Sequence, residues 1–399
     1  MKKLSLALIA LFVQMISALA QSSGTDSSSY ASRKLHVDEV NLVSSYYSQN
    51  GNHSAVTGGI GTEQLTDIAN SIDLKLIGRD NKNRIRGIGL ELGIDHYTSA
   101  SSDKIDPNTI SSASSHDTRV YPSLSYTLTD ETKNYSLGAI GSYSHEFDYT
   151  SFGIGINGSK TSKDKNREFA LKLQAYFDTW TVIYPIELRT GGGTGRNRTQ
   201  GTSPRDSYSA SFSYSQVINK RFQIAVLLDL IDQTGLLATK YQRVYFTDQS
   251  EKVENLPNNR FKTPIGIRAN YFLGDRIILR GYYRYYTDDW GIKAHTASLE
   301  VPVKINPYFS VAPLYRYYTQ TAGDHFAPYG MHDPTETYYT SDYDLSAFSS
   351  QFVGLNVRIS PEKGVFGIQH FSMLELRYGH YMRSDGLKSD VVALNLRFK

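Results

Sequence analysis

Polar and apolar residues alternate along most of this chain, and no other feature constrains its fold as strongly. In the final segment, 387–398, Leu394 and Leu396 lie on one face of an extended chain, whereas Asn395 and Arg397 lie on the other. Successive side chains of a β-strand point to opposite faces, so a period of two indicates strands with one apolar and one polar face. The same period recurs in three earlier segments, 84–99, 221–232 and 276–288.

About sixteen extended segments follow one another after the first few dozen residues, and none shows the 3.6-residue apolar period of a helix. Most are about 12 to 16 residues long, whereas strands of soluble proteins average ~5–6 residues and strands that cross a membrane need ~9–11. The predicted strands are 35–47, 65–79, 84–99, 116–129, 134–147, 149–161, 167–181, 207–218, 221–232, 261–273, 276–288, 291–305, 307–320, 342–360, 369–383 and 387–398.

The connections between these segments are sorted by length. Every second connection is tight, and the long ones all fall in the other set: 48–64, 100–115, 182–206, 233–260 and 321–341. A barrel with short periplasmic turns and long extracellular loops sorts its connections in this way, whereas a soluble sandwich has no reason to do so. We therefore predict an all-β fold, a transmembrane antiparallel up-and-down β-barrel of about 16 strands (14–16) with both termini on the periplasmic side.

The first residues have the features of an export signal. A positive start, Met1-Lys2-Lys3, precedes the apolar stretch 4–16, and small residues follow at Ala18-Leu19-Ala20. The stretch is too short to span a bilayer comfortably, which favours a cleaved signal peptide over a membrane anchor. We predict a signal peptide at 1–20, a Ser-rich periplasmic linker at 21–34 and an outer-membrane barrel domain at 35–399.

Composition excludes several chemistries. The chain has no cysteine, which removes disulfides, thiolate catalysis and Cys-ligated metals, and its net charge of +3 gives no indication of a nucleic-acid partner. Tyrosine is abundant, at 30 residues, and its runs at 282–286 and 315–318 fall near the predicted outer ends of strands. Such runs suit an aromatic girdle at headgroup depth, although tyrosine also favours strands of any kind.

Three stretches resemble a known family. They are 45–63 (SYYSQNGNHSAVTGGIGTE), 112–119 (SASSHDTR) and 146–151 (EFDYTS). The resemblance is to the barrel family called domain of unknown function 3570, and it implies an outer-membrane protein of Gram-negative bacteria. Genes of that family often lie beside those of thioredoxin-like proteins and flavin transferases, which implies periplasmic redox partners and an extracytoplasmic redox or metal-handling system.

The parity of the strands predicts which charges face the lumen, because a charge on the lipid face is costly. The arginines that are predicted to face the lumen concentrate in the last seven predicted strands. We expect either an ion-paired network that stiffens and partly fills the lumen or a basic wall that favours anionic solutes. The predicted lumen charges are Asp73, Lys75, Glu91, Lys172, Asp178, Asp229, Arg268, Arg280, Arg284, Glu300, Arg316, Arg358, Glu375, Arg377 and Arg397.

A second group of charges falls near the outer mouth. Its acids come from neighbouring predicted strands, and two further groups lie in the first outer loop. Carboxylates and imidazoles together can bind a divalent cation, so the group is a candidate metal site. The alternative is that Arg119 and backbone N–H groups form hydrogen bonds and ion pairs with these acids. The candidate metal ligands are Asp95, Asp117, Glu146, Asp148, His53 and Glu63. The glycines of 58–61, in the same first loop, allow that loop to fold back compactly.

The predicted function is porin-like passage of small hydrophilic solutes or ions. The first alternative is a plugged barrel that serves as the membrane subunit of a redox or metal-handling complex, or as a structural partner. A hydrolase at the rim is the third, suggested by Asp–His neighbours such as Asp95-His96 and His332-Asp333, but adjacent strand residues point to opposite faces and no enzyme is expected. No cofactor is expected to be required, and a divalent cation at the extracellular mouth is the one candidate ligand. The expected partners are outer-membrane lipid, lipopolysaccharide and the barrel-assembly machinery, which reads a C-terminal strand with an aromatic such as Phe398.

Overall fold

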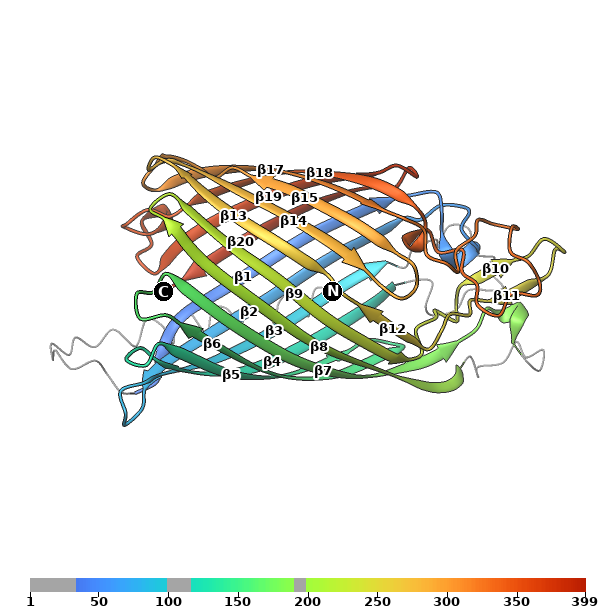
Figure 1. Ribbon diagram of the computed structural model, residues 1–399, viewed down its shortest axis with the longest axis horizontal. Helices are drawn as coiled ribbons and strands as arrows, with labels where there is room; N and C mark the ends of the chain where they lie inside the picture. Colours follow the sequence, from blue (N-terminus) through green and yellow to red (C-terminus); the bar gives the residue numbers. More distant parts are fainter. Residues whose placement is uncertain (1–33, 99–115, 190–198) are drawn as a thin grey trace.

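The computed structural model describes residues 34–98, 116–189 and 199–399, which form one closed β-barrel with loops at both ends (Figure 1). Eighteen strand segments belong to a single antiparallel sheet, and β10 (Arg243–Tyr245) pairs only with β11 (Glu251–Val253). The sheet closes because β1 (His36–Asn50) pairs with β20 (Lys388–Phe398) over its outer two thirds. Closure leaves no unpaired strand edge, which is what a strand needs to cross a hydrocarbon layer.

The remaining strands follow in chain order around the barrel. They are β2 (Leu65–Arg79), β3 (Ile85–Thr98), β4 (His116–Asp130), β5 (Tyr135–His145), β6 (Tyr149–Thr161), β7 (Arg167–Ile183), β8 (Thr199–Asn219), β9 (Phe222–Gly235), β12 (Asn259–Lys262), β13 (Ile265–Leu273), β14 (Ile277–Thr287), β15 (Lys293–Glu300), β16 (Val303–Asn306), β17 (Phe309–Gln320), β18 (Phe348–Ile359) and β19 (Phe371–Arg383). Neighbours around the barrel pair in chain order, with β12 and β13, and likewise β15 and β16, acting as successive parts of one strand, so the topology is up-and-down.

Two barrel strands are each divided by a proline, which cannot donate a ladder hydrogen bond. Pro264 separates β12 from β13, which both pair with β9, and Pro302 separates β15 from β16, which both pair with β14 and β17. Counting each divided strand once gives a barrel of sixteen strands, and the predicted fold is confirmed.

Most predicted strand limits lie within a few residues of the observed ones, with two exceptions. The strand predicted at 342–360 begins only at Phe348, because 343–345 is a 3₁₀ turn that Asp342 caps through the backbone N–H of Asp344. The strand predicted at 207–218 begins at Thr199, because β7 continues to Ile183 and pairs with the added residues. β7 and β8 are therefore longer at the outer end than the sequence predicted.

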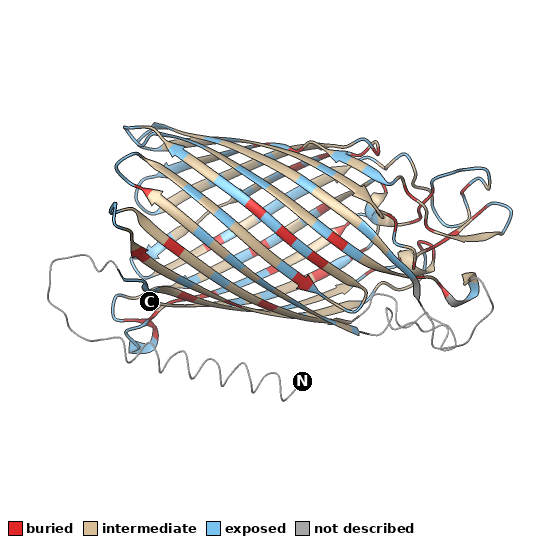
Figure 2. Ribbon diagram, turned by 90° about the horizontal axis from the view of Figure 1, so that it is seen from below, coloured by how far each residue is buried: buried red, intermediate tan, exposed pale blue. Residues whose placement is uncertain are grey.

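The two faces of the barrel differ as the alternation predicts. Large apolar side chains such as Leu124, Ile156 and Leu394 are exposed on the outward face, where lipid would cover them. Cross-strand partners share that face, as in the row Ile68, Tyr46 and Val392 on β2, β1 and β20. Figure 2 shows the resulting bands of different burial along each strand.

The long loops gather at one end of the barrel, opposite the end where β1 begins and β20 finishes (Figure 1). Among the described residues they are 51–64, 184–189, 236–258 and 321–347, and all join an odd-numbered barrel strand to the next. The predicted signal peptide, the linker up to residue 33, the loop 100–115 and part of the loop 182–206 lie outside the described residues. No helix in the described ranges is long and apolar enough to cross a membrane.

Candidate functional site: the lumen and its outer mouth

The inner face of β13–β20, here called the basic wall, carries most of the arginines predicted for the lumen. Three of them have acidic partners close by on the same or the adjacent strand. Arg280 Nη1 lies 3.2 Å from Glu300 Oε2, Arg377 Nη2 lies 2.5 Å from Glu375 Oε1, and Arg397 Nε lies 3.3 Å from Glu39 Oε1. These pairs run along the wall, between residues of one strand or of adjacent strands.

The other four predicted arginines of the basic wall have no such partner. In the part of the chain that the structure describes, no carboxylate oxygen lies within 4.0 Å of Arg268, Arg284, Arg316 or Arg358. Two of them rest on inward-facing rings: Arg268 lies 5.9 Å from the centroid of Tyr282, and Arg316 lies 4.9 Å from that of Phe352. The wall therefore holds an excess of guanidinium charge, since rings orient these side chains but do not neutralise them.

The inner face of β2–β9, here called the acidic wall, has the opposite balance. Its carboxylates at Asp73, Glu91 and Asp229 share it with Lys75 and Lys172, and the structure places all five on the face opposite the exposed apolar residues. The Ser123 hydroxyl donates to Glu91 at 3.0 Å, and Lys75 Nζ lies 2.9 Å from Asp38 Oδ2.

None of the ion pairs between described residues crosses the lumen. Each one in the barrel joins residues of one strand, of neighbouring strands or of the turns beside them, as Arg205 of β8 does with Asp178 of β7 at 2.8 Å. Three inner-wall cations also stay open to solvent, with side-chain exposures of 60% for Lys75, 48% for Arg280 and 63% for Arg377. The pairs therefore connect strands within the wall.

Three loops, 51–64, 236–258 and 321–347, gather and pack together beyond the outer end of the barrel and are here called the cap (Figure 1). The cap has its own core, in which Val244 and Phe246 are fully or almost fully buried and the Phe246 and Tyr339 rings meet edge to face at 4.9 Å. His332, 1% exposed, lies beside them, with Nδ1 2.6 Å from Glu336 Oε2 and Nε2 2.9 Å from the carbonyl oxygen of Thr340.

Buried acids hold the loops of the cap together. The side chain of Glu254 accepts hydrogen bonds from the Thr340 hydroxyl and the Thr239 backbone N–H, both at 2.5 Å. Burial and the nearby carboxylate of Asp342 raise the pKa of Glu254 to about 8. Burial and Asp344 raise the pKa of Asp342 itself to about 6. The two acids join segments of the chain that lie far apart in sequence.

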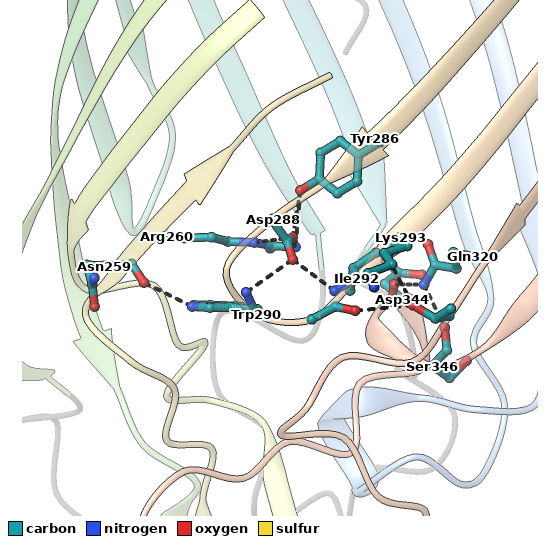
Figure 3. A network of polar contacts seen from close by, with 12 residues as sticks. Asn259, Arg260, Tyr286, Asp288, Trp290, Ile292, Lys293, Gln320, Asp344 and Ser346 are labelled. Carbon is teal, nitrogen blue, oxygen red and sulfur yellow. Dashed lines mark hydrogen bonds and ion pairs between the residues drawn. The ribbon is translucent and has the colours of Figure 1, made fainter. Parts of the chain in front are cut away.

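The cap is anchored to the barrel rim by Asp288, whose side chain is 0% exposed (Figure 3). Its carboxylate accepts from Arg260 Nη2 at 2.5 Å, from the Tyr286 hydroxyl at 2.7 Å and from the backbone N–H groups of Trp290 and Ile292. Arg260 in turn stacks 4.4 Å from the Trp290 ring centroid.

The turn that Asp288 organises holds the loop 321–347. The Thr321 hydroxyl donates to the carbonyl oxygen of Gly291 at 3.2 Å. The backbone N–H of Asp324 donates to the carbonyl oxygen of Trp290 at 2.8 Å. Further along the loop, Gln320 Nε2 donates to the carbonyls of Asp344 and Ser346 (Figure 3). The rim and the loop therefore share one hydrogen-bonded network.

The predicted metal ligands separate into groups. Asp117 and Glu146 lie near Asp148, and together with burial they raise its pKa to about 6. Asp95 instead accepts from the Tyr121 hydroxyl at 2.9 Å, and Glu146 accepts from that of Tyr97 at 2.5 Å. Asp117 accepts from the backbone N–H of Phe147 at 2.9 Å, as the alternative expected, whereas Arg119 donates to the Ser144 hydroxyl.

The two candidates from the first outer loop lie elsewhere. His53 stacks on Tyr343 at 3.8 Å between centroids and bonds to the carbonyl of Gly59, so it belongs to the cap. Glu63 accepts from Gln49 Nε2, and burial and Asp344 raise its pKa to about 7. Across the described ranges no three His, Asp or Glu side chains are grouped so that they could hold a metal ion. The divalent-cation site stays a prediction.

The compact first loop follows from its glycines, as the sequence analysis expected. Gly58, Gly59 and Gly61 all have φ between 80° and 88°. A Cβ atom on Gly59 would lie 2.7 Å from the carbonyl oxygen of Ser341, so the first loop packs closely against 321–347. The cap core and the Asp288 network were not predicted. The one signal in the sequence was the apolar run Val244-Tyr245-Phe246 inside a long loop.

A family model matches residues 93–384 and is described as protein of unknown function, DUF3570. Of the stretches that carried the resemblance, 112–119 and 146–151 lie inside the match, whereas 45–63 lies before it. No curated protein matches the chain.

Similar solved structures include three proteins from Pseudomonas. A BenF-like porin from Pseudomonas fluorescens Pf-5 is 9% identical with a TM-score of 0.42, over 90% of this chain and 98% of the porin. OccK9 (OpdG) from Pseudomonas aeruginosa is 9% identical with a TM-score of 0.44, over 92% and 98%. The outer membrane protein opdK from the same species is 8% identical with a TM-score of 0.40, over 92% and 99%. Because a family model matches most of its length, this sixteen-stranded β-barrel belongs to the family described as protein of unknown function DUF3570.

Proposed function

We propose that this barrel conducts small hydrophilic solutes or ions across the outer membrane. One observation carries the proposal: three cationic side chains on the inner wall, Lys75, Arg280 and Arg377, keep about half or more of their area exposed. A lumen filled by packed side chains would bury them, whereas a lumen that contains water solvates them. The inner wall below the cap also contains little buried apolar surface among the described residues.

The cap supports a second candidate, a barrel that is closed until a partner or a condition displaces its loops. Its buried core and its anchoring at Asp288 make it an ordered layer at the mouth. Such a barrel would serve as the membrane subunit of a larger extracytoplasmic complex. The two candidates differ in one measurable property, which is the conductance of the isolated protein.

The test is single-channel recording of the purified, refolded full chain in a planar bilayer. Folding is checked first by gel mobility, because an intact barrel migrates faster before boiling than after. Steady openings support free diffusion through the lumen. A correctly folded protein that is silent at every voltage contradicts the first candidate and favours the second.

A further inference from the structure

The two walls of the lumen carry different charge. Among the predicted lumen charges, the basic wall has seven arginines and two glutamates: Arg268, Arg280, Arg284, Arg316, Arg358, Arg377, Arg397, Glu300 and Glu375. The acidic wall, across the lumen, carries Asp73, Glu91 and Asp229 with two lysines among the same set, and its fourth acid, Asp178, is paired with Arg205. Low-dielectric walls focus the field of such charges, so the excess of arginine favours an anion on the side of the basic wall.

A cavity of about 580 Å³ lies against the basic wall. Three arginines from three strands line it: Arg280 of β14, Arg358 of β18 and Arg377 of β19. This volume is in the range of small-molecule sites, and it lies within a polar wall.

The strand register explains why the arginines meet there. Arg358 pairs with Glu375, and the next inward pair along the same two strands is Asn356 with Arg377. The four side chains form a square in which the two arginines occupy opposite corners. Cross-strand neighbours on one face lie ~4.5–5.5 Å apart and diagonal ones ~7–8 Å, so one small anion can reach both guanidinium groups.

The square contains guanidinium N–H donors that are not all bonded to carboxylates of the protein. Glu375 is buried and already accepts from Arg377, and Arg358 has no carboxylate within 4.0 Å in the described chain. Ser310, the partner of Arg358 on β17, adds a hydroxyl.

We infer that this cavity is a binding subsite for small solutes that carry an oxyanion, a carboxylate or a phosphate, with Arg358 as the principal contact and Arg377 and Arg280 beside it. The inference rests on the proposed function, because it names the class of solute that the lumen conducts. A guanidinium presents a planar fork of donors that matches a carboxylate or phosphate with two parallel hydrogen bonds. Glu300 and Glu375 orient their arginines and leave the remaining donors for the solute.

The test measures block of single-channel chloride current by succinate and, separately, by inorganic phosphate. Arg358→Gln removes the unpaired charge and keeps a polar side chain of similar length. Lys75→Gln is the matched control, because it removes one positive charge from an exposed side chain on the acidic wall. We expect saturable block of the wild type, block that is about tenfold weaker in Arg358→Gln, and no change in Lys75→Gln.

Each outcome decides a different point. Equal weakening in both variants, or block that does not saturate, overturns the subsite and leaves only a general field. Conductance without any block also overturns the subsite and leaves the proposed function standing. Block by succinate alone, or by phosphate alone, supports the subsite and identifies the oxyanion.

A silent channel would contradict the proposed function but still leave the subsite testable. Titration calorimetry of the refolded protein in detergent then measures binding of succinate and phosphate directly. Binding that is about tenfold weaker in Arg358→Gln than in Lys75→Gln supports the subsite, and no binding to the wild type overturns it. Gel mobility before and after boiling establishes that each variant is folded.

Discussion

The cap and the lumen both contain many charged residues, but they treat them in opposite ways. In the cap, Glu254 is 2% exposed and Asp342 lies beside it, held by hydroxyl, amide and backbone donors. In the lumen, Lys75 and Arg377 keep more than half of their side-chain area exposed. Charged residues therefore hold structure together in the cap, whereas cations of the lumen such as these remain available to solutes.

Burial explains the difference. A charge that leaves water must be compensated by partners, so removing a partner in the cap is costly, whereas water replaces a lost partner in the lumen. The cap should consequently respond strongly to single substitutions and to pH. The lumen should tolerate substitutions in stability and report them in selectivity.

The largest effect is expected for Asp288→Ala. This change leaves the largely buried Arg260 without its carboxylate and removes five hydrogen bonds at the rim, two of them from Arg260. It should lower the free energy of local opening by about 3–5 kcal/mol, seen as faster hydrogen exchange in 321–347. Asp289→Ala is the control, because Asp289 is exposed and next in sequence. Similar exchange in the two variants would show that the network does not anchor the cap.

A smaller effect is expected from pH. The folded cap binds protons at Glu254 and Asp342 more tightly than an open cap does, because burial raises both pKa values, to about 8 and about 6. Its stability is therefore greatest below the ordinary carboxyl range of about 4 and falls as pH rises through about 6 and then about 8. Protease cleavage in 236–258 should become faster over this window.

Two variants sharpen this pH prediction. Glu254→Gln should remove the upper part of the pH dependence, because the amide does not ionise. Asp248→Asn, at the exposed tip of the β10–β11 hairpin, should keep it. A cap that becomes more resistant to protease as pH rises would contradict the burial of these acids.

The smallest effect is expected in the lumen. Lys75→Ala breaks the ion pair with Asp38, but the lysine side chain is 60% exposed, so the free energy of unfolding should fall by less than about 1 kcal/mol. Urea titration followed by gel mobility measures it. A loss as large as that of Asp288→Ala would mean that the lumen is packed and dry.

Most of the barrel could be predicted from the sequence because its signals are local. Alternation indicates which face of a strand meets lipid, and the length of a connection indicates the end of the barrel at which that connection lies. These local signals predicted all sixteen barrel strands. The breaks at Pro264 and Pro302 were not predicted, since a period of two continues through a single missing hydrogen bond. The early start of β8 also depends on a partner, the outer end of β7.

The cap could not be predicted, because its contacts join residues that no periodic pattern relates. Glu254 and Thr340 are 86 residues apart, and Arg243 Nη1 reaches the carbonyl of Val56 across 187. Barrel closure also changed the surroundings of Glu63. Strand order suggested β3 to β6 as its neighbours, but closure places β20 on the other side of β1, so Glu63 lies near Asp344 and Arg383.

The seam between β1 and β20 has a consequence for how the chain reaches its final state. Arg397 Nε donates to Asn41 Oδ1 at 3.2 Å, a contact between residues 356 positions apart. Such a contact carries the greatest loop-closure entropy in the barrel and requires every intervening strand to be in register. Until it forms, β1 and β20 each present a row of unpaired backbone groups, which hydrocarbon does not tolerate. We therefore expect that the chain completes its insertion into the membrane only after β20 has been synthesised and has paired with β1.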